Sequence, residues 1–180
     1  SEDIELLKEA GYSTIFVFRN SNVSLYLEEL KDIDEGYFIF LNSIYECAFD
    51  VNDFSEKYVI NRFTNSGNEH VEISNDKCRT EWMTVRNKNT SVSFLIDNEK
   101  IVPCKDSKSV YHCYLPTLEN AIIACKINAD FSTDPSRKHI TMDEKTKEAL
   151  QQVAFIFVSV LEMAFNEADT GKYKNILSMY

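Results

Sequence analysis

Apolar and polar residues alternate along the middle of the chain in a pattern typical of β-strands. The first two strand-like runs flank the turn-forming tetrapeptide Asn-Ser-Gly-Asn, so they predict a β-hairpin. The fourth run also fits a helix, and the last two are apolar enough to predict buried strands. The six runs cover residues 57–64, 69–74, 79–87, 91–97, 109–116 and 121–131.

The N-terminal part of the chain mixes helical and strand periodicity. Residues 4–10 predict the end of a helix that Gly11 stops, and residues 13–19 are rich in β-branched and aromatic residues that predict a strand. Residues 23–33 have apolar positions at helical spacing with charges between them. Within residues 36–49 we expect a short helix to about Leu41 and then a strand from Ile44.

An amphipathic pattern near the C-terminus predicts a long helix from about Met142 to Asn166. Thr141 and Glu144 have the spacing of a capping box, in which both side chains bind otherwise unpaired backbone N–H groups at the helix start. We expect the second half of this helix to be deeply packed, and residues 170–180 to begin another helix. The apolar face consists of Leu150, Val153, Phe157, Val160, Leu161 and Ala164, widened by Ala154, Phe155, Ile156 and Val158.

This order of elements predicts an α+β fold: a mixed, mostly antiparallel sheet packed with helices in a two- or three-layer sandwich that ends in a long helix. The 180 residues indicate one domain over residues 1–168, followed by the start of a helical segment at 169–180. The most apolar run, Val153 to Phe165, contains Glu162 and is too short to span a bilayer, so we interpret it as part of a core helix.

The formal charge of −10 narrows the range of partners. Phosphate neutralisation needs basic patches, so nonspecific binding to nucleic acids or acidic membranes is not expected. Five cysteines without a C-x-x-C pair suggest neither a disulfide framework nor a zinc site, and they favour reduced thiols in a cytoplasmic protein. The histidines lack metal-ligand spacing, so no metal site is expected.

Common catalytic motifs do not occur. Only four glycines are present, and neither a phosphate-binding loop nor a nucleophile elbow can be found. His112 and Cys113 are neighbours in a strand-like run, so their side chains should point to opposite faces. What stands out is the loop of the segment NADFSTDPSRKHITMDEKTKEAL, residues 128–150, which carries Arg137. From the residues alone, Arg137 either pairs locally with Asp130 or Asp134, or is held out to meet a charged group, with Lys138 and His139 as solvated neighbours.

From Tyr111 onward the sequence is similar to the middle domain of the heat-shock-ninety chaperones and their bacterial relatives among the GHKL ATPases, a group that includes sacsin-like proteins. The earlier segments GYSTIFVFR and YFIFLNSIYECAFD resemble the entry into this domain. The similarity is specific in the last third and does not extend to the stretch of residues 50–110. The matching pieces are Leu115-Pro116-Thr117, the strand Ile122 to Asp130, Ser136-Arg137, the helix to Asn166 and Tyr173.

The resemblance implies the middle, or transducer, domain of an ATP-dependent molecular chaperone-like ATPase. In that family the loop arginine reaches a neighbouring domain and contacts the γ-phosphate of ATP, so Arg137 is the expected catalytic and cofactor-binding residue. ATP with Mg²⁺ is then the cofactor of the parent protein, and none is expected on this chain alone. The family's ATP-binding motifs do not occur here, so we expect the ATPase domain to precede Ser1.

The resemblance also implies partners for this chain. The expected partners are the protein's own N-terminal ATPase domain, client or partner proteins, and a second copy of the parent in a homodimer. Two alternatives stay open: an acidic protein–protein interaction module with no link to nucleotide, and a free-standing enzyme that uses carboxylates or a Cys–His pair. An upstream segment with an E-x-x-x-N helix and a D-x-G-x-G motif would favour the transducer domain over both.

Overall fold

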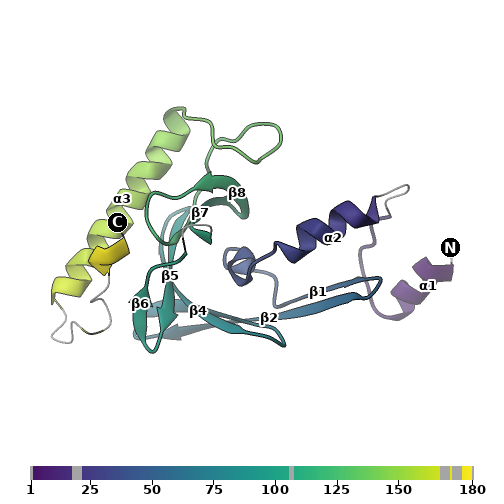
Figure 1. Cartoon of the computed structure of the whole chain (residues 1–180). Coiled ribbons are helices and arrows are strands. Elements are labelled where there is room, and N and C mark those ends of the chain that lie inside the picture. The colour runs from purple at the N-terminus through teal and green to yellow at the C-terminus, as the bar shows by residue number, and fades with distance from the viewer. Residues whose placement is uncertain (1, 18–21, 106–107, 167–170, 172–175, 180) are drawn as a thin grey trace. The chain divides into compact units, whose positions relative to one another are not determined.

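The protein is described by a computed structural model that covers the chain except residues 1, 18–21, 106–107, 167–170, 172–175 and 180 (Figure 1). The chain divides into two compact units, Ser1–Asp32 and Ile33–Tyr180. The first unit carries two helices. The second carries the sheet, the long C-terminal helix and all the candidate functional residues.

In the first unit, α1 (Glu2–Glu9) and α2 (Val23–Lys31) confirm the two predicted helices. Asn22 caps α2 by accepting a hydrogen bond from the Leu25 N–H at 3.3 Å. The strand predicted at 13–19 is wrong over residues 13–17, and residues 18–19 lie outside the described part of the chain. Because β-propensity reflects packing against neighbouring strands, these apolar residues do not form a strand in a unit whose described part contains no other strand.

The second unit is built on a nine-stranded sheet with the order β1-β2-β3-β4-β5-β9-β7-β8, with β6 pairing to β5. All neighbouring strands run antiparallel except β7 and β9, which are parallel. The predicted α+β class is therefore confirmed. The elements are η1 (Glu35–Phe38), β1 (Glu46–Val51), β2 (Phe54–Asn65), β3 (Asn68–Ser74), β4 (Arg79–Asn87), β5 (Thr90–Asp97), β6 (Lys100–Val102), β7 (Val110–Cys113), β8 (Leu115–Asn120), β9 (Lys126–Asn128), α3 (Glu144–Asn166) and η3 (Ile176–Met179).

The predicted hairpin is formed by β2 and β3. Asn65 lies opposite Asn68, which leaves Ser66 and Gly67 as a two-residue turn. Both have positive φ, 51° and 80°, as a turn that matches the right-handed twist of two antiparallel strands requires. The predicted strand at 79–87 is confirmed as β4, and the ambiguous run at 91–97 is the strand β5.

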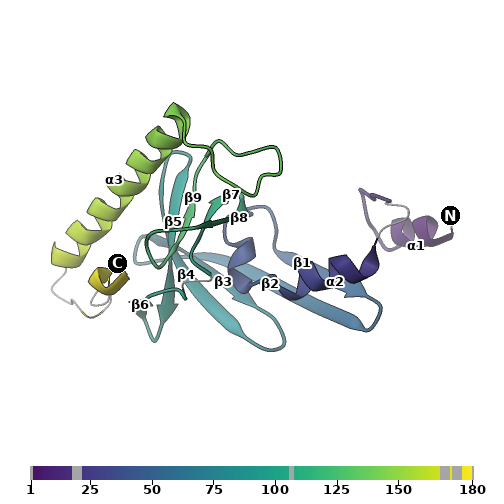
Figure 2. The same cartoon turned by 45° about the horizontal axis from the view of Figure 1, so that its top comes forward.

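The sheet separates two apolar clusters, because consecutive strand residues point to opposite faces. On β4, Met83 belongs to the cluster under α3, whereas Trp82 belongs to the cluster under the η1 segment. The α3 cluster includes Phe157, whose ring packs edge-on against Phe94 with centroids 5.6 Å apart. Figures 1 and 2 show α3 lying along one face of the sheet.

Helix α3 buries only one stripe of its surface. Val153, Ile156, Phe157 and Val160 are buried, as the periodicity predicts for a helix on a sheet. The expectation of deep packing throughout its second half is wrong, because Phe155 is 61% exposed and Val158 53% exposed. A single helix on one face of a sheet leaves its outer side to solvent. By length and composition this helix could also cross a membrane.

The start of α3 also differs from the prediction. Thr141 does not cap the helix; its N–H donates to the Ser132 carbonyl at 2.8 Å. Asp143 accepts a hydrogen bond from the Thr146 N–H at 2.9 Å instead, so the helix begins at Glu144 rather than near Met142. The Thr146 hydroxyl in turn accepts from the Ser132 N–H at 3.1 Å. The side chain of Asp143 therefore replaces the expected capping box.

Two apolar runs form shorter strands than predicted. The run 109–116 breaks at Tyr114, which has a φ of 65°, so β7 ends and β8 begins there. Of the run 121–131, only Lys126–Asn128 pairs as β9. Of the predicted last helix, Ile176–Met179 is a short 3-10 helix, and residues 172–175 lie outside the described residues. All five cysteines are free thiols.

The η1 face of the sheet contains a buried charge. Lys126 is 1% exposed, and its ammonium lies 3.2 Å from the Asp34 carboxylate and 5.8 Å from the centroid of the Trp82 ring. A buried ammonium is tolerated when it is paired in this way. The Lys126 side chain passes directly against Gly36, where an added Cβ would lie 2.0 Å from the Lys126 Cε.

Gly36→Ala should therefore lower the free energy of unfolding by about 1–2 kcal/mol, because the end of the buried Lys126 side chain must shift from the position in which it pairs with Asp34. Urea unfolding measures this change. In a Lys126→Ala background the clash is gone, so the same Gly36→Ala change should cost clearly less. Equal costs in both backgrounds would show that the close approach to Lys126 is not the cause.

Candidate functional site

The loop between β9 and α3 is folded as a tight, internally bonded hairpin. Thr133 and Ile140 form an isolated antiparallel bridge at its base. The Arg137 N–H donates to the Asp134 carbonyl at 2.9 Å, which closes a turn with Pro135 in its second position. The Asp134 N–H donates to the His139 carbonyl at 2.9 Å. The local sequence, with Asp and Pro at the turn, favours this fold of the chain.

The Asp134 carboxylate fastens the tip of the loop. It accepts hydrogen bonds from the Ser136 hydroxyl at 2.6 Å, the Lys138 N–H at 3.0 Å and the His139 N–H at 3.3 Å. The Ser136 hydroxyl, followed by the two N–H groups, holds the pKa of this carboxyl below its usual range. The carboxylate is therefore ionised at neutral pH, and its contribution to loop stability is lost only when the pH falls through the lowered pKa.

Arg137 lies at this tip with its side chain exposed. Its φ of 60° places the backbone in the left-handed region, which is uncommon for a residue with a Cβ. Among the residues that the structure describes, its guanidinium has no hydrogen-bond or ion-pair partner. Asp130 pairs with Lys145 at 2.9 Å, and Asp134 is engaged by the loop itself. The local ion pairs considered from the sequence are therefore not found.

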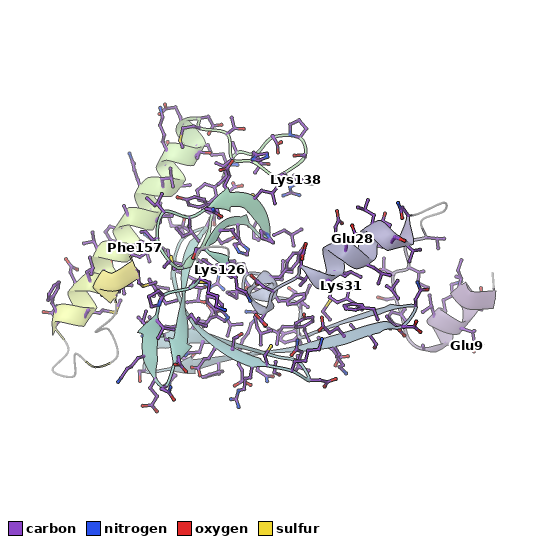
Figure 3. All side chains as sticks on the ribbon, in the orientation of Figure 1. Glu9, Glu28, Lys31, Lys126, Lys138 and Phe157 are labelled. Atoms are coloured by element: carbon purple, nitrogen blue, oxygen red, sulfur yellow. The ribbon has the colours of Figure 1, made fainter. Side chains whose placement is uncertain are left out.

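The flanks of the loop are held against β8. The Leu118 N–H donates to the Lys138 carbonyl at 2.8 Å, and His139 Nδ1 lies 2.9 Å from the Glu119 carboxylate. His139 is exposed, as expected for a solvated neighbour, and has Glu119 as its partner, whereas Lys138 makes no side-chain ion pair among the described residues. Figure 3 shows Lys138 on the loop, away from the body of the sheet. The arrangement presents two unpaired cations on a fastened loop.

Two cavities adjoin this loop: one of about 370 Å³ that is lined by Asp130 and Lys145, and a smaller one at its base. The cavity at its base has a volume of about 160 Å³, smaller than the roughly 300–1,000 Å³ of typical ligand sites. The residues that line it are mostly apolar: Tyr111, Glu119, Phe131, Ile140, Met142, Thr146 and Leu150. Arg137 lines neither of these two cavities, so its guanidinium is available to a phosphate that approaches the loop from outside.

The His112–Cys113 pair is not a catalytic site. His112 is fully buried, with the Phe40 ring edge-on at 4.9 Å, and burial together with nearby Lys126 lowers its pKa to about 3. The Cys113 thiol points the other way and donates to the Phe131 carbonyl at 3.6 Å. As the strand geometry predicts, the two side chains do not meet.

Two polar pairs were not predicted from the sequence. Lys126 pairs with Asp34, and His70 Nδ1 lies 2.6 Å from the Glu81 carboxylate. Each pair joins elements that are distant in sequence or on different strands, so residue spacing cannot reveal it. The available signal was a polar residue inside an apolar strand run, which marks a buried group that needs a partner. Within the described residues, no group of three or more His, Cys, Asp or Glu side chains could hold a metal ion.

Comparison of the chain with protein-family models, with curated proteins and with solved structures finds no match.

Proposed function

We propose that this chain is the middle, transducer-like domain of a GHKL ATPase of the heat-shock-ninety chaperone type. In this proposal Arg137 meets the γ-phosphate of an ATP that is bound with Mg²⁺ by the N-terminal ATPase domain of the same protein. The chain then couples the nucleotide state to the segments that follow. One observation carries the proposal: Arg137 is exposed and unpaired at the tip of a loop that Asp134 fastens.

The chemistry of this arrangement suits a phosphate. A guanidinium cannot lose its charge, and its planar fork of N–H donors matches phosphate oxygens. A loop that is already fastened loses little conformational entropy when the arginine binds, so more of the interaction energy is available for stabilising the transition state. The resemblance of the segment around Ser136-Arg137 to the family's arginine loop adds the phosphate as the specific target. The decisive test is the ATP turnover of the parent protein with and without this guanidinium.

The proposal assigns the remaining roles by the same resemblance. Partners are the ATPase domain, client proteins of the parent, and a second parent copy in a homodimer. The location is the cytoplasm, where free thiols are stable. The proposal includes no nonspecific binding to nucleic acids or acidic membranes, because the chain carries a formal charge of −10.

The isolated chain should neither bind nor hydrolyse ATP. Arg137 is a single exposed cation that lines neither of the two cavities at the loop, and one such contact contributes only about 1 kcal/mol or less in water. Calorimetric titration with ATP and Mg²⁺ should show no heat of binding at micromolar concentrations. Micromolar affinity would place a nucleotide site on this chain. It would contradict the proposal that the N-terminal domain binds ATP and that this chain contributes only Arg137.

A second candidate function, an acidic protein–protein interaction module, is favoured by the outer side of α3. Phe155, Val158 and Phe165 are exposed there, and apolar side chains of this size on one helix face are typical of binding surfaces. The two candidate functions differ in whether they require the Arg137 side chain. The interaction module works without Arg137, whereas the transducer depends on it.

A further inference from the structure

A cavity of about 580 Å³, which Gly171 also lines, shares no described lining residue with the Arg137 loop. Its volume falls within the roughly 300–1,000 Å³ of small-molecule sites. The end of the β2–β3 hairpin forms one wall through Phe63 and Ser66, and the β5–β6 turn forms another through Glu99 and Lys100. Neither the sequence motifs nor the proposed function assigns a role to this cavity.

His70 on β3 lines this cavity and has an unused nitrogen. The residue is 2% exposed, and its Nδ1 lies 2.6 Å from the Glu81 carboxylate. In the ring tautomer that carries its hydrogen on Nδ1, this hydrogen is donated to Glu81 and Nε2 is a hydrogen-bond acceptor. No described residue bonds to Nε2, although it is buried. Buried polar atoms in folded proteins nearly always have a partner, so this nitrogen indicates a missing ligand.

Phe63 adds an aromatic surface. It lies opposite His70 in the pairing of β2 with β3, and the two rings stack with centroids 5.4 Å apart. Phe63 is nevertheless 41% exposed and lines the cavity. The face of an aromatic ring carries negative charge density and attracts cations within about 6 Å of its centroid.

Hydrogen-bond acceptors and negative charge dominate the remaining lining. Glu81 and Glu99 contribute carboxylates, and in the described structure Glu99 has no ion-pair partner. Among the described lining residues Lys100, at the start of β6, contributes one ammonium beside the two carboxylates. The chain as a whole has a formal charge of −10, which raises the local concentration of cations around it.

We infer that this cavity binds an organic cation of the ammonium or guanidinium type. The cation lies against Phe63, donates a hydrogen bond to His70 Nε2, and is neutralised by Glu81 and Glu99. Anions are excluded by the two carboxylates. The ligand is either a free polyamine or a Lys or Arg side chain of a partner, since both carry the same donor groups.

Two-dimensional ¹H–¹⁵N NMR of the whole chain tests the inference with agmatine, spermidine, Nα-acetylarginine amide and the dianion succinate as probes. At least one cation should shift the amide signals of residues 63–70 and 96–100 with a Kd of about 1 mM. Binding of the capped arginine amide would indicate a partner's side chain, and binding of spermidine alone would indicate a free polyamine. Succinate should leave these signals unchanged.

Substitutions at three exposed positions should change the affinity for the cation in different directions. Glu99→Gln should weaken cation binding about threefold, and Lys100→Gln should tighten it about threefold. Glu162→Gln, which changes the net charge equally on the exposed side of α3, should leave it unchanged. The inference is overturned if no cation shifts the lining signals at 20-fold excess over the expected Kd, about 20 mM. It is equally overturned if succinate binds, or if Lys100→Gln weakens binding.

Discussion

Replacing Arg137 by Ala in the parent protein should lower ATP turnover by roughly 10- to 1,000-fold while leaving ATP affinity nearly unchanged. The guanidinium lies on the surface of this chain, so it joins the nucleotide only when the two domains close. An interaction made mainly in the closed, reacting state lowers the barrier without tightening ground-state binding. Steady-state ATPase assays and nucleotide titration measure the two effects separately.

The fold of the loop allows a clean comparison of variants at this position. Because Arg137 has a φ of 60°, any residue with a Cβ carries the same backbone strain there, so Ala removes the guanidinium and keeps the strain. Arg137→Lys should restore turnover only in part, since an ammonium keeps the charge and loses the fork. Lys138→Ala, the neighbouring exposed cation, serves as the control for net charge and should have a much smaller effect.

Thermal melts of each variant check that the fold is intact. Full ATP turnover in a well-folded Arg137→Ala protein would remove the transducer assignment and leave the interaction module as the better candidate. A loss of turnover that Lys138→Ala reproduces would point to general electrostatic attraction between the domains instead of a specific contact.

The sheet could be predicted from the sequence wherever local pattern and final pairing agree. The hairpin β2–β3 and strand β4 follow from alternation and a short turn, because both signals lie within a few residues. Strand β9 could not be bounded in the same way. Its apolar run is long, but only Lys126–Asn128 has neighbouring strands to pair with on both sides.

The predictions for the helix α3 were wrong where tertiary contacts, and not the local sequence, decide the structure. The sequence contains both a Thr-x-x-Glu and an Asp-x-x-Thr pattern at the start of α3, and the structure uses Asp143 with Thr146 because Ser132 binds the backbone of Thr141. The outer side of α3 carries Phe155, Val158 and Phe165 among polar residues, and these apolar residues favoured the prediction of burial. What decides exposure is whether another layer covers the helix, and the local sequence does not encode that.

The candidate sites also differ in how far the sequence predicts them. The Arg137 loop is local, and its Asp, Pro and Ser residues predict a tight turn that presents the arginine. The sequence suggested Asp134 only as a possible ion-pair partner of Arg137, and its hydrogen bonds within the loop emerge from the structure. The pairs His70–Glu81 and Lys126–Asp34 depend on strand register and on the position of η1, so they emerge only in three dimensions.

Arg62 gives the largest stability effect that we expect. It lies on β2 and holds the η1 segment against the sheet. Its guanidinium donates to the carbonyls of Ile39 at 2.9 Å, Phe38 at 3.1 Å and Leu41 at 2.9 Å. These carbonyls lie at the end of η1 and just after it; those of Phe38 and Leu41 also accept from the N–H groups of Leu41 and Ile44, at 3.1 and 3.0 Å. A half-buried cation that serves three acceptors at once fixes the position of a segment that contributes Phe38, Ile39 and Phe40 to the core.

Arg62→Ala should therefore lower the free energy of unfolding by about 3 kcal/mol, since hydrogen bonds to charged groups contribute about 1.5–3 kcal/mol each and are not additive. Arg62→Met keeps the apolar part of the side chain, so it should recover only a minor share of this loss. Arg79→Ala, which removes an exposed arginine paired with Glu72 on the same sheet, is the matched control and should cost under about 1 kcal/mol.

Urea unfolding gives the magnitudes, and amide hydrogen exchange locates the cause. In the Arg62 variants, amides of residues 36–41 should exchange faster relative to those of β4 and β5, because the segment detaches before the sheet unfolds. Uniform acceleration across the sheet would mean that Arg62 contributes only to global stability. An Arg62→Ala protein no less stable than Arg79→Ala would show that the three carbonyls find water at no cost, and that the guanidinium does not fasten η1.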